Sequence, residues 1–231
     1  QSVIYMKKGL DSEGEVSLDP NTFSKDGTVA LSAFSESRDT KYAAYGISRA
    51  GSDWQEFYVM EIESGEKLDD HLEWIKFSGI SWLGDGFFYS RYDPPEEGDE
   101  LKGENLNSKV FYHRTGTPQF EDKLIYKDDS HPEWSFHVEV TEDEQYMVLT
   151  AIESTSGNAI AFKKAGGDTR PFTWLDQGFD HEYYLIGNQG NQMYVRTNYQ
   201  APRYRLVKID LDRPEKENWV DIIPEHESNV L

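Results

Sequence analysis

The stretch DTKYAAYGISRAGSDWQEFYVMEIES, residues 39–64, contains a pattern that the rest of the chain repeats. An apolar run at 42–47 follows a polar turn at 35–40, and a Gly-Ser-Asp turn at 51–53 leads into alternating residues at 57–62. Such alternation places one row of side chains on a buried face and the other row toward a neighbouring layer or solvent. Both runs are rich in Tyr, Phe, Val and Ile, so they predict two antiparallel strands.

The same unit recurs three times along the chain. Its apolar run begins again at Phe87, Tyr146 and Met193, at successive spacings of 45, 59 and 47 residues counted from Tyr42, and the longest spacing contains an insertion at 93–107. Second strands are predicted at 108–114, 158–164 and 203–210, and shorter closing strands at 123–127, 172–175 and 219–223. Four strands per unit at a period of about 45 residues are typical of a β-propeller blade. A β-sandwich or a plain meander also has many short strands and turns, but the fixed period with a fixed internal order favours the propeller.

The two ends of the chain fit this repeat differently. Residues 2–7 resemble the third strand of a unit and residues 15–18 its closing strand, while the final unit closes at 219–223 before a polar tail. The sequence therefore predicts an all-β protein of about four and a half blades, each a four-stranded antiparallel sheet. An open arrangement leaves strand edges unpaired, so we expect the chain to be part of a longer polypeptide. A complete ring of four or five blades with unusual connections is the alternative.

Composition excludes several functional classes. The formal net charge is −20, from 43 acidic and 23 basic residues, and such a field repels nucleic acids and anionic membranes. Cysteine is absent, which removes disulfides, thiolate chemistry and cysteine-ligated zinc and is compatible with a reducing compartment. No run is long enough to cross a membrane, and the first ten residues do not read as a secretory signal. These features favour the cytoplasm and leave the periplasm open.

No catalytic or metal-binding motif stands out. The string nearest to G-x-S-x-G is Gly-Ile-Ser-Trp-Leu at 79–83, which lacks the final glycine and lies in a predicted strand. The six histidines are scattered without metal-ligand spacing, and the Asp-x-Asp at 210–212 lacks the rest of a calcium loop and is interpreted as a turn. We therefore expect no catalytic triad, no metal and no cofactor in this chain.

Six segments of the sequence form a distinctive series: IYMKKG (4–9), LDPNTFSKDGTVAL (18–31), AAYGISRAGSDW (43–54), WIKFSGISWLGDGFFYSRY (74–92), TNYQAPRYRLVKIDL (197–211) and IIPEHESNVL (222–231). Taken in order, they resemble the propeller domain of the prolyl oligopeptidase family, and its bacterial members in particular. The resemblance extends from residue 1 to residue 231 and is specific, because the matching segments occur in the family's order and at fitting distances.

This resemblance implies a two-domain serine peptidase that cleaves short peptides after proline. In the family, a seven-bladed propeller whose first and last blades share no strand covers an α/β-hydrolase domain that carries the Ser, Asp and His residues. Residues 1–231 would be part of that N-terminal propeller, with the catalytic domain outside this chain, and the partners would be short proline-containing peptides and the hydrolase domain of the same protein. We expect no nucleic-acid and no membrane partner.

The resemblance also points to substrate-binding residues. Alignment of GDGFFYSRY places Phe88 where the family has an aromatic residue lining the pocket for the substrate residue two before proline. Two further pocket positions fall near Ser135 and Thr155, where the family has larger or sulfur-containing side chains. Trp134 and Phe136 are neighbours that could take their place.

The sequence leaves two other functions open. A stand-alone propeller could bind protein or carbohydrate on its ring surface, and a related oligopeptidase could cleave after basic residues. The acidic insertion at 93–104 is interpreted as a solvated loop, or as a rim loop that contacts a partner or basic substrate. The AGSDW and PEHE segments favour the prolyl type.

Overall fold

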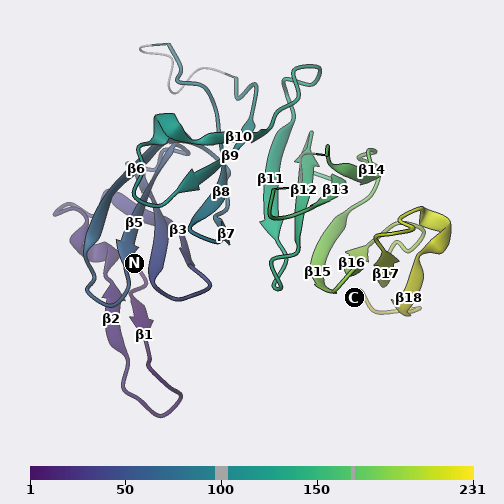
Figure 1. Cartoon of the computed structure of the whole chain (residues 1–231), viewed down its shortest axis with the longest axis horizontal. Helices are drawn as coiled ribbons and strands as arrows, with labels where there is room; N and C mark the ends of the chain where they lie inside the picture. Colours follow the sequence, from purple (N-terminus) through teal and green to yellow (C-terminus); the bar gives the residue numbers. More distant parts are fainter. Residues whose placement is uncertain (97–103, 168–169) are drawn as a thin grey trace. The chain divides into compact units, whose positions relative to one another are not determined.

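The computed structural model describes residues 1–96, 104–167 and 170–231 (Figure 1). The chain divides into two compact units, Gln1–Lys127 and Asp128–Leu231. Part of the acidic insertion, residues 97–103, lies outside the described residues, so its interpretation as a loop is not addressed.

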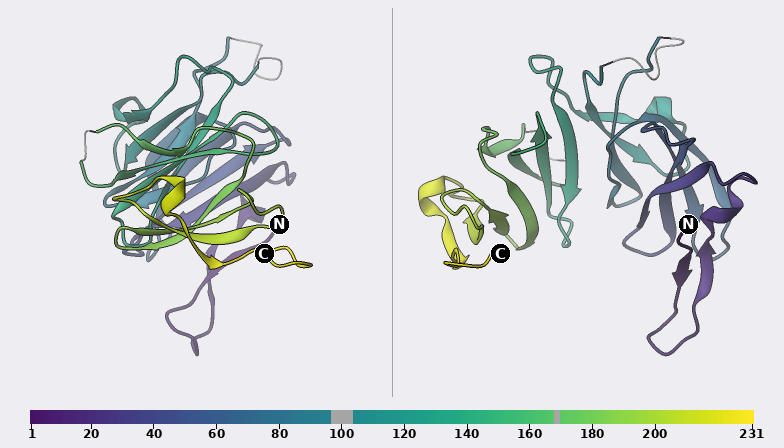
Figure 2. Two further views of the ribbon diagram at one scale, coloured as in Figure 1. Left: turned by 90° about the vertical axis from the view of Figure 1, so that its right-hand side faces the viewer. Right: turned by 180° about the vertical axis from the view of Figure 1, so that it is seen from behind.

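The first unit contains a hairpin and two blades. The hairpin of β1 and β2 projects away from the blade sheets of this unit (Figures 1 and 2). Its strands are β1 (Ile4–Met6) and β2 (Glu15–Leu18); blade 1 consists of β3 (Val29–Glu36), β4 (Tyr42–Arg49), β5 (Gln55–Glu61) and β6 (Lys67–Ile75); blade 2 consists of β7 (Ser81–Leu83), β8 (Gly86–Arg91), β9 (Lys109–Arg114) and β10 (Lys123–Tyr126).

The strands of blades 1 and 2 form one continuous hydrogen-bonded path, yet they are two blades. Only the pair Ile75 and Arg91 connects β6 to β8 in the ladder, whereas β4 and β5 share seven paired positions. The two sheets therefore meet at one corner and are otherwise separate meanders.

The second unit contains blades 3 and 4, each an antiparallel four-stranded sheet in sequence order. Blade 3 consists of β11 (Ser135–Val140), β12 (Tyr146–Ile152), β13 (Ala159–Lys164) and β14 (Thr173–Asp176); blade 4 consists of β15 (Tyr183–Gln189), β16 (Gln192–Thr197), β17 (Arg205–Asp210) and β18 (Val220–Ile223). Short 3₁₀ turns occur at Pro20–Thr22, Gln119–Glu121 and Lys216–Asn218.

One turn geometry joins the first and second strands in both blade 1 and blade 3. The Ser37 hydroxyl donates to Asp39 at 2.7 Å, and the Thr141 hydroxyl donates to Asp143 at 2.8 Å. The first backbone NH of the following strand donates to the same hydroxyl, at 2.9 and 3.0 Å. Because these side chains replace backbone partners within a tight turn, the sequence pattern Ser/Thr-x-Asp-x-x-Tyr specifies the hairpin.

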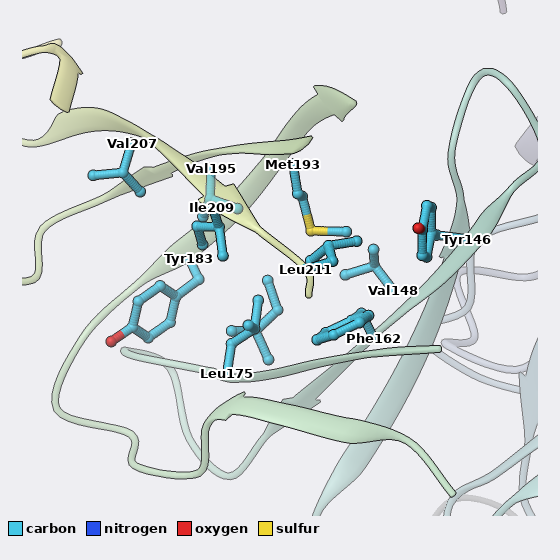
Figure 3. Close-up of a cluster of buried hydrophobic side chains, with 11 residues drawn as sticks. Tyr146, Val148, Phe162, Leu175, Tyr183, Met193, Val195, Val207, Ile209 and Leu211 are labelled. Atoms are coloured by element: carbon cyan, nitrogen blue, oxygen red, sulfur yellow. The ribbon is translucent and has the colours of Figure 1, made fainter. Parts of the chain in front are cut away.

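Apolar clusters hold neighbouring blades together inside each unit. In the first unit, Phe57 and Leu72 of blade 1 pack with Trp82, Phe87 and Tyr89 of blade 2. In the second unit, buried residues of blade 3 face those of blade 4 across one cluster (Figure 3). Each fully buried side chain of this size contributes about 1.5–3 kcal/mol, so the clusters are the main attraction between sheets.

The predicted fold class is confirmed, and the predicted strands coincide with observed ones. The repeat in the sequence does not give bounds for the first strand of each blade, which the structure places at β3, β7, β11 and β15. Burial alternates regularly in β11 but not in β3 or β15, and β7 has only three residues, so alternation alone identifies most of these strands poorly.

Candidate functional site

Phe88 lies in the middle of β8 and is 4% exposed. It pairs with Ser81 across the ladder, and its ring packs against Tyr112 with centroids 5.1 Å apart. The Tyr112 hydroxyl in turn donates to the backbone oxygen of Leu83 at 2.8 Å, which fixes the ring beneath Phe88. Phe88 therefore has a single, well-supported position on the face of blade 2 opposite to Phe87 and Tyr89.

Trp134 and Phe136 lie at the start of blade 3 in different environments. Phe136 belongs to β11 and is 1% exposed, whereas Trp134 precedes the strand and is half-buried. The indole stacks on His131 at 3.8 Å and meets Phe179 edge-on at 4.8 Å. Its NH donates to Glu153 at 3.3 Å. Trp134 is thus a rigid aromatic side chain at the rim of the blade, and Phe136 is a buried core residue of β11.

A hollow of about 480 Å³ opens at the same end of blades 3 and 4, and Thr155 is one of its lining residues. Ser135 is paired with Ile152, which also lines the hollow. The remaining wall comes from Glu139 and Thr150 of blade 3, the loop 154–158 and residues 182–185 at the beginning of blade 4. The two small residues that depart from the family pattern therefore lie in or beside a polar hollow.

Glu182 is a lining residue that the sequence did not reveal. Its carboxylate accepts hydrogen bonds from the Tyr204 hydroxyl and, at 2.9 Å, from the Tyr184 hydroxyl. These hydrogen bonds, more than the nearby charge of Arg196, hold the pKa of Glu182 below its ordinary value. The carboxylate is therefore a fixed negative charge at the wall of the hollow.

Gly157 shapes the loop at this hollow. Its φ is +72°, and a Cβ at this position would lie 1.8 Å from the backbone oxygen of Phe179. The backbone of the neighbouring Asn158 donates to His181 oxygen at 2.9 Å, and its side-chain amide bonds both backbone groups of Tyr183 at 2.8 and 3.1 Å. The loop and the start of blade 4 are thereby joined directly.

A second buried polar group joins blades 1 and 2. The His113 ring is fully buried, with Nδ1 2.7 Å from Asp122 and Nε2 2.9 Å from Asp70. Asp122 also accepts from the Tyr89 hydroxyl at 2.6 Å, and Asp70 from the Gly116 NH at 2.7 Å. Burial alone would lower the pKa of His113, but the hydrogen bonds to Asp122 and Asp70 outweigh it and raise the pKa to about 9. The charged ring donates to both carboxylates and, being sealed from solvent, has a structural role.

Three sequence features form ordinary strand, turn or tail structure: the string at 79–83, the Asp-x-Asp at 210–212 and the histidine of the polar tail. Ser81 begins β7, in a strand rather than at a strand-to-helix turn. Asp210 accepts from the Asp212 NH at 3.0 Å, as in a simple turn, and His226 accepts from the Ser228 NH at 3.2 Å in the polar tail. Among residues 1–96, 104–167 and 170–231, no group of three or more His, Asp or Glu residues could hold a metal ion. In the same residues, no helix has the length and apolar character needed to span a bilayer.

Four-stranded meanders that pack on one another through apolar faces define the protein class as a β-propeller domain. Residues 1–231 match the family model described as the prolyl oligopeptidase N-terminal β-propeller domain. The chain belongs to this family.

Similar proteins agree with this assignment. The chain is 41% identical to a prolyl endopeptidase of Elizabethkingia meningoseptica over 97% of its own length, and 38% identical to prolyl oligopeptidase A of Amanita bisporigera over 93%. It spans about a third of each relative, 32% and 31% of their lengths. Among solved structures, prolyl oligopeptidase B of Galerina marginata bound to a 35mer hydrolysis and macrocyclization substrate is similar with a TM-score of 0.86 and 31% identity. That match covers 98% of this chain and 35% of the other.

Proposed function

We propose that the polypeptide carrying residues 1–231 is a serine-type prolyl endopeptidase, and that this chain is part of the propeller that restricts access to its active site. The observation that supports the proposal is the 41% identity to a named prolyl endopeptidase across nearly the whole chain. The chemistry is acyl transfer through a serine nucleophile with histidine as base. An α/β-hydrolase domain of the same polypeptide supplies these groups, and short proline-containing peptides are the substrates.

The test is an assay of the whole polypeptide, isolated from its source under reversible protease inhibition and identified by intact mass. After removal of the inhibitor, we expect a mass well above the 26.7 kDa of these residues and cleavage of a fluorogenic Gly-Pro peptide but not of its Gly-Ala counterpart. A serine-directed phosphonate should abolish cleavage. A 26.7 kDa product that cleaves neither peptide would instead support a stand-alone binding module.

We further propose that Phe88 lines the pocket for the substrate residue two before proline. In the whole enzyme, Phe88→Ala should raise the activation free energy for kcat/KM by about 1–3 kcal/mol on peptides with an apolar residue at that position, because apolar contact is lost. This corresponds to about 5- to 150-fold. Peptides with glycine at that position are the internal control, since they have little to lose.

Phe88→Leu separates the pocket from folding, because it keeps most of the buried volume. We expect this variant to retain the wild-type melting temperature and to lose part of the preference for large apolar residues. Equal losses on the apolar and the glycine peptides, in a folded enzyme, would remove Phe88 from the pocket.

We also propose Trp134 as a substrate-contacting residue of blade 3, with Phe136 as a core residue of the same blade. The half-buried indole has an accessible surface, whereas Phe136 is 1% exposed. We also propose a cytoplasmic location, supported by the absence of cysteine, with the periplasm as the alternative. Fractionation of the source cells tests the location.

A further inference from the structure

A small aromatic hollow lies at the rim of blade 1, and Phe88 is not among its lining residues. It measures about 190 Å³, and its walls include the rings of Trp54 and Trp74. The two indoles meet edge-on with centroids 5.8 Å apart. Ligand pockets for drug-sized molecules start at about 300 Å³, so this hollow suits a single side chain.

The backbone is distorted where the hollow forms. Gln55 pairs with Ile75 and Phe57 pairs with Leu72, so β6 has one more residue than β5 between these two pairs. Within this bulge, Trp74 has a φ of +61°, a conformation that bulky residues rarely adopt. Bulges and strained residues of this kind occur where a side chain is held in a particular direction, frequently at binding sites.

The charges at the hollow leave one carboxylate without a partner. Arg49 Nε lies 2.7 Å from Glu56, and the two charges neutralise each other. Burial alone would raise the pKa of Glu56, but the hydrogen bonds from Arg49, Tyr58 and His71 outweigh it and lower the pKa to about 2. The Glu73 backbone bonds Gln119, but its carboxylate has no ion pair among the residues that the structure describes. Of the three charged lining residues, one is basic and two are acidic, so the hollow carries a net negative charge.

An unsatisfied acceptor points to the same ligand chemistry. Gln55 Oε1 is buried and has no hydrogen-bond partner in the described structure, and Gln55 lines the hollow. Leaving such an oxygen unpaired is costly. The oxygen is closed to solvent, so a ligand that donates a hydrogen bond would relieve the cost once the Gln55 amide turns toward the hollow. An apolar ring, such as that of proline, would fill the space and leave the oxygen unpaired.

We propose that this hollow binds the guanidinium group of an arginine in a peptide. A planar guanidinium has several NH donors for Glu73 and Gln55 and stacks on indole faces, whereas an ammonium is more strongly hydrated and does not stack. The nearby Lys76, whose Nζ is 5.1 Å from the Trp54 ring, is held by Asn105 at 3.0 Å and does not line the hollow. The site would select peptides that carry an arginine.

The test is a calorimetric binding titration of the whole polypeptide with N-acetyl-arginine amide. N-acetyl-citrulline amide is the matched ligand, because it has nearly the same shape and no charge. We expect saturable binding of the arginine compound only, weakened about tenfold or more by Glu73→Gln and by Trp74→Ala. Glu66→Gln is the control variant, since Glu66 is an exposed acidic residue in the turn between β5 and β6 and is not part of the hollow.

Equal binding of the arginine and citrulline compounds, no saturable binding, or an unchanged affinity in Glu73→Gln would each overturn the proposal. Because Trp74→Ala removes a large side chain, Glu73→Gln carries the test if that variant does not fold. The readout is binding rather than cleavage, so its result is independent of whether the polypeptide hydrolyses prolyl peptides.

Discussion

Replacing His113 with alanine is expected to lower the free energy of unfolding by about 3–5 kcal/mol. The substitution leaves Asp70 and Asp122 buried without the positive charge that lies 2.9 and 2.7 Å from them. Two like charges then face each other in a site with no exposure to solvent. Urea unfolding of the whole polypeptide, with hydrogen exchange of peptides from blades 1 and 2, measures the loss and its place.

His71→Ala is the matched control, because His71 is also paired with a carboxylate in blade 1. Its side chain is 43% exposed and lies 2.9 Å from Glu56, and an exposed pair of this kind is worth about 1 kcal/mol or less. A His113→Ala variant no less stable than His71→Ala would show that the buried ring does not hold the two blades together.

The same histidine makes stability depend on pH at the alkaline side. The pKa of His113 is raised from 6.5 to about 9 in the folded chain, so its contribution is fully present below pH 6.5 and disappears as the pH rises through 9. The change amounts to about 3 kcal/mol. Between pH 6 and 10, we expect the free energy of unfolding of the wild-type protein to fall by this amount relative to that of His113→Ala. If the free energies of unfolding of the two proteins change in parallel with pH, the assignment is wrong.

Gly157→Ala is expected to destabilise the second unit by about 2–5 kcal/mol, from backbone strain and steric overlap together. The overlap involves the backbone oxygen of Phe179, which cannot rotate away as a side chain does. Gly190 is the matched control because its φ is +57° and a Cβ there meets nothing within 4 Å. Gly190→Ala should therefore cost only the strain, about 1 kcal/mol.

Thermal unfolding followed by circular dichroism compares the two glycine variants. A Gly157→Ala protein that melts at the temperature of Gly190→Ala would mean that the loop moves away from blade 4 without cost. The hollow beside Thr155 would then be adaptable rather than fixed.

The repeat could be predicted because the second strand of each blade contains a continuous or alternating run of buried residues. Residues 146–149 are all buried, and the same apolar run appears in each copy. The first strands could not be predicted as well, since β7 has only three residues and burial in β3 and β15 does not alternate, although it does in β11.

The candidate site was predictable only in part. Phe88, Trp134 and Phe136 came from the family resemblance, and their burial and neighbours follow from the structure. The role of Glu182 could not be foreseen, because Tyr204 and Tyr184 reach it only after β15 and β17 are brought into one sheet. In the same way, the hollow at Trp74 depends on a bulge in which no residue type is unusual by itself.

Backbone pairing between blades 1 and 2 is limited to the pair Ile75 and Arg91, and the strands of blades 3 and 4 form separate sheets in the described structure. Neighbouring blades consequently recognise each other by side chains, with little need for matched backbone register. During evolution, a segment of about 45 residues could be duplicated or lost as a whole, and the new neighbours could adapt by point mutation alone. Blade number is then a heritable character that can change without a redesign of the individual sheet.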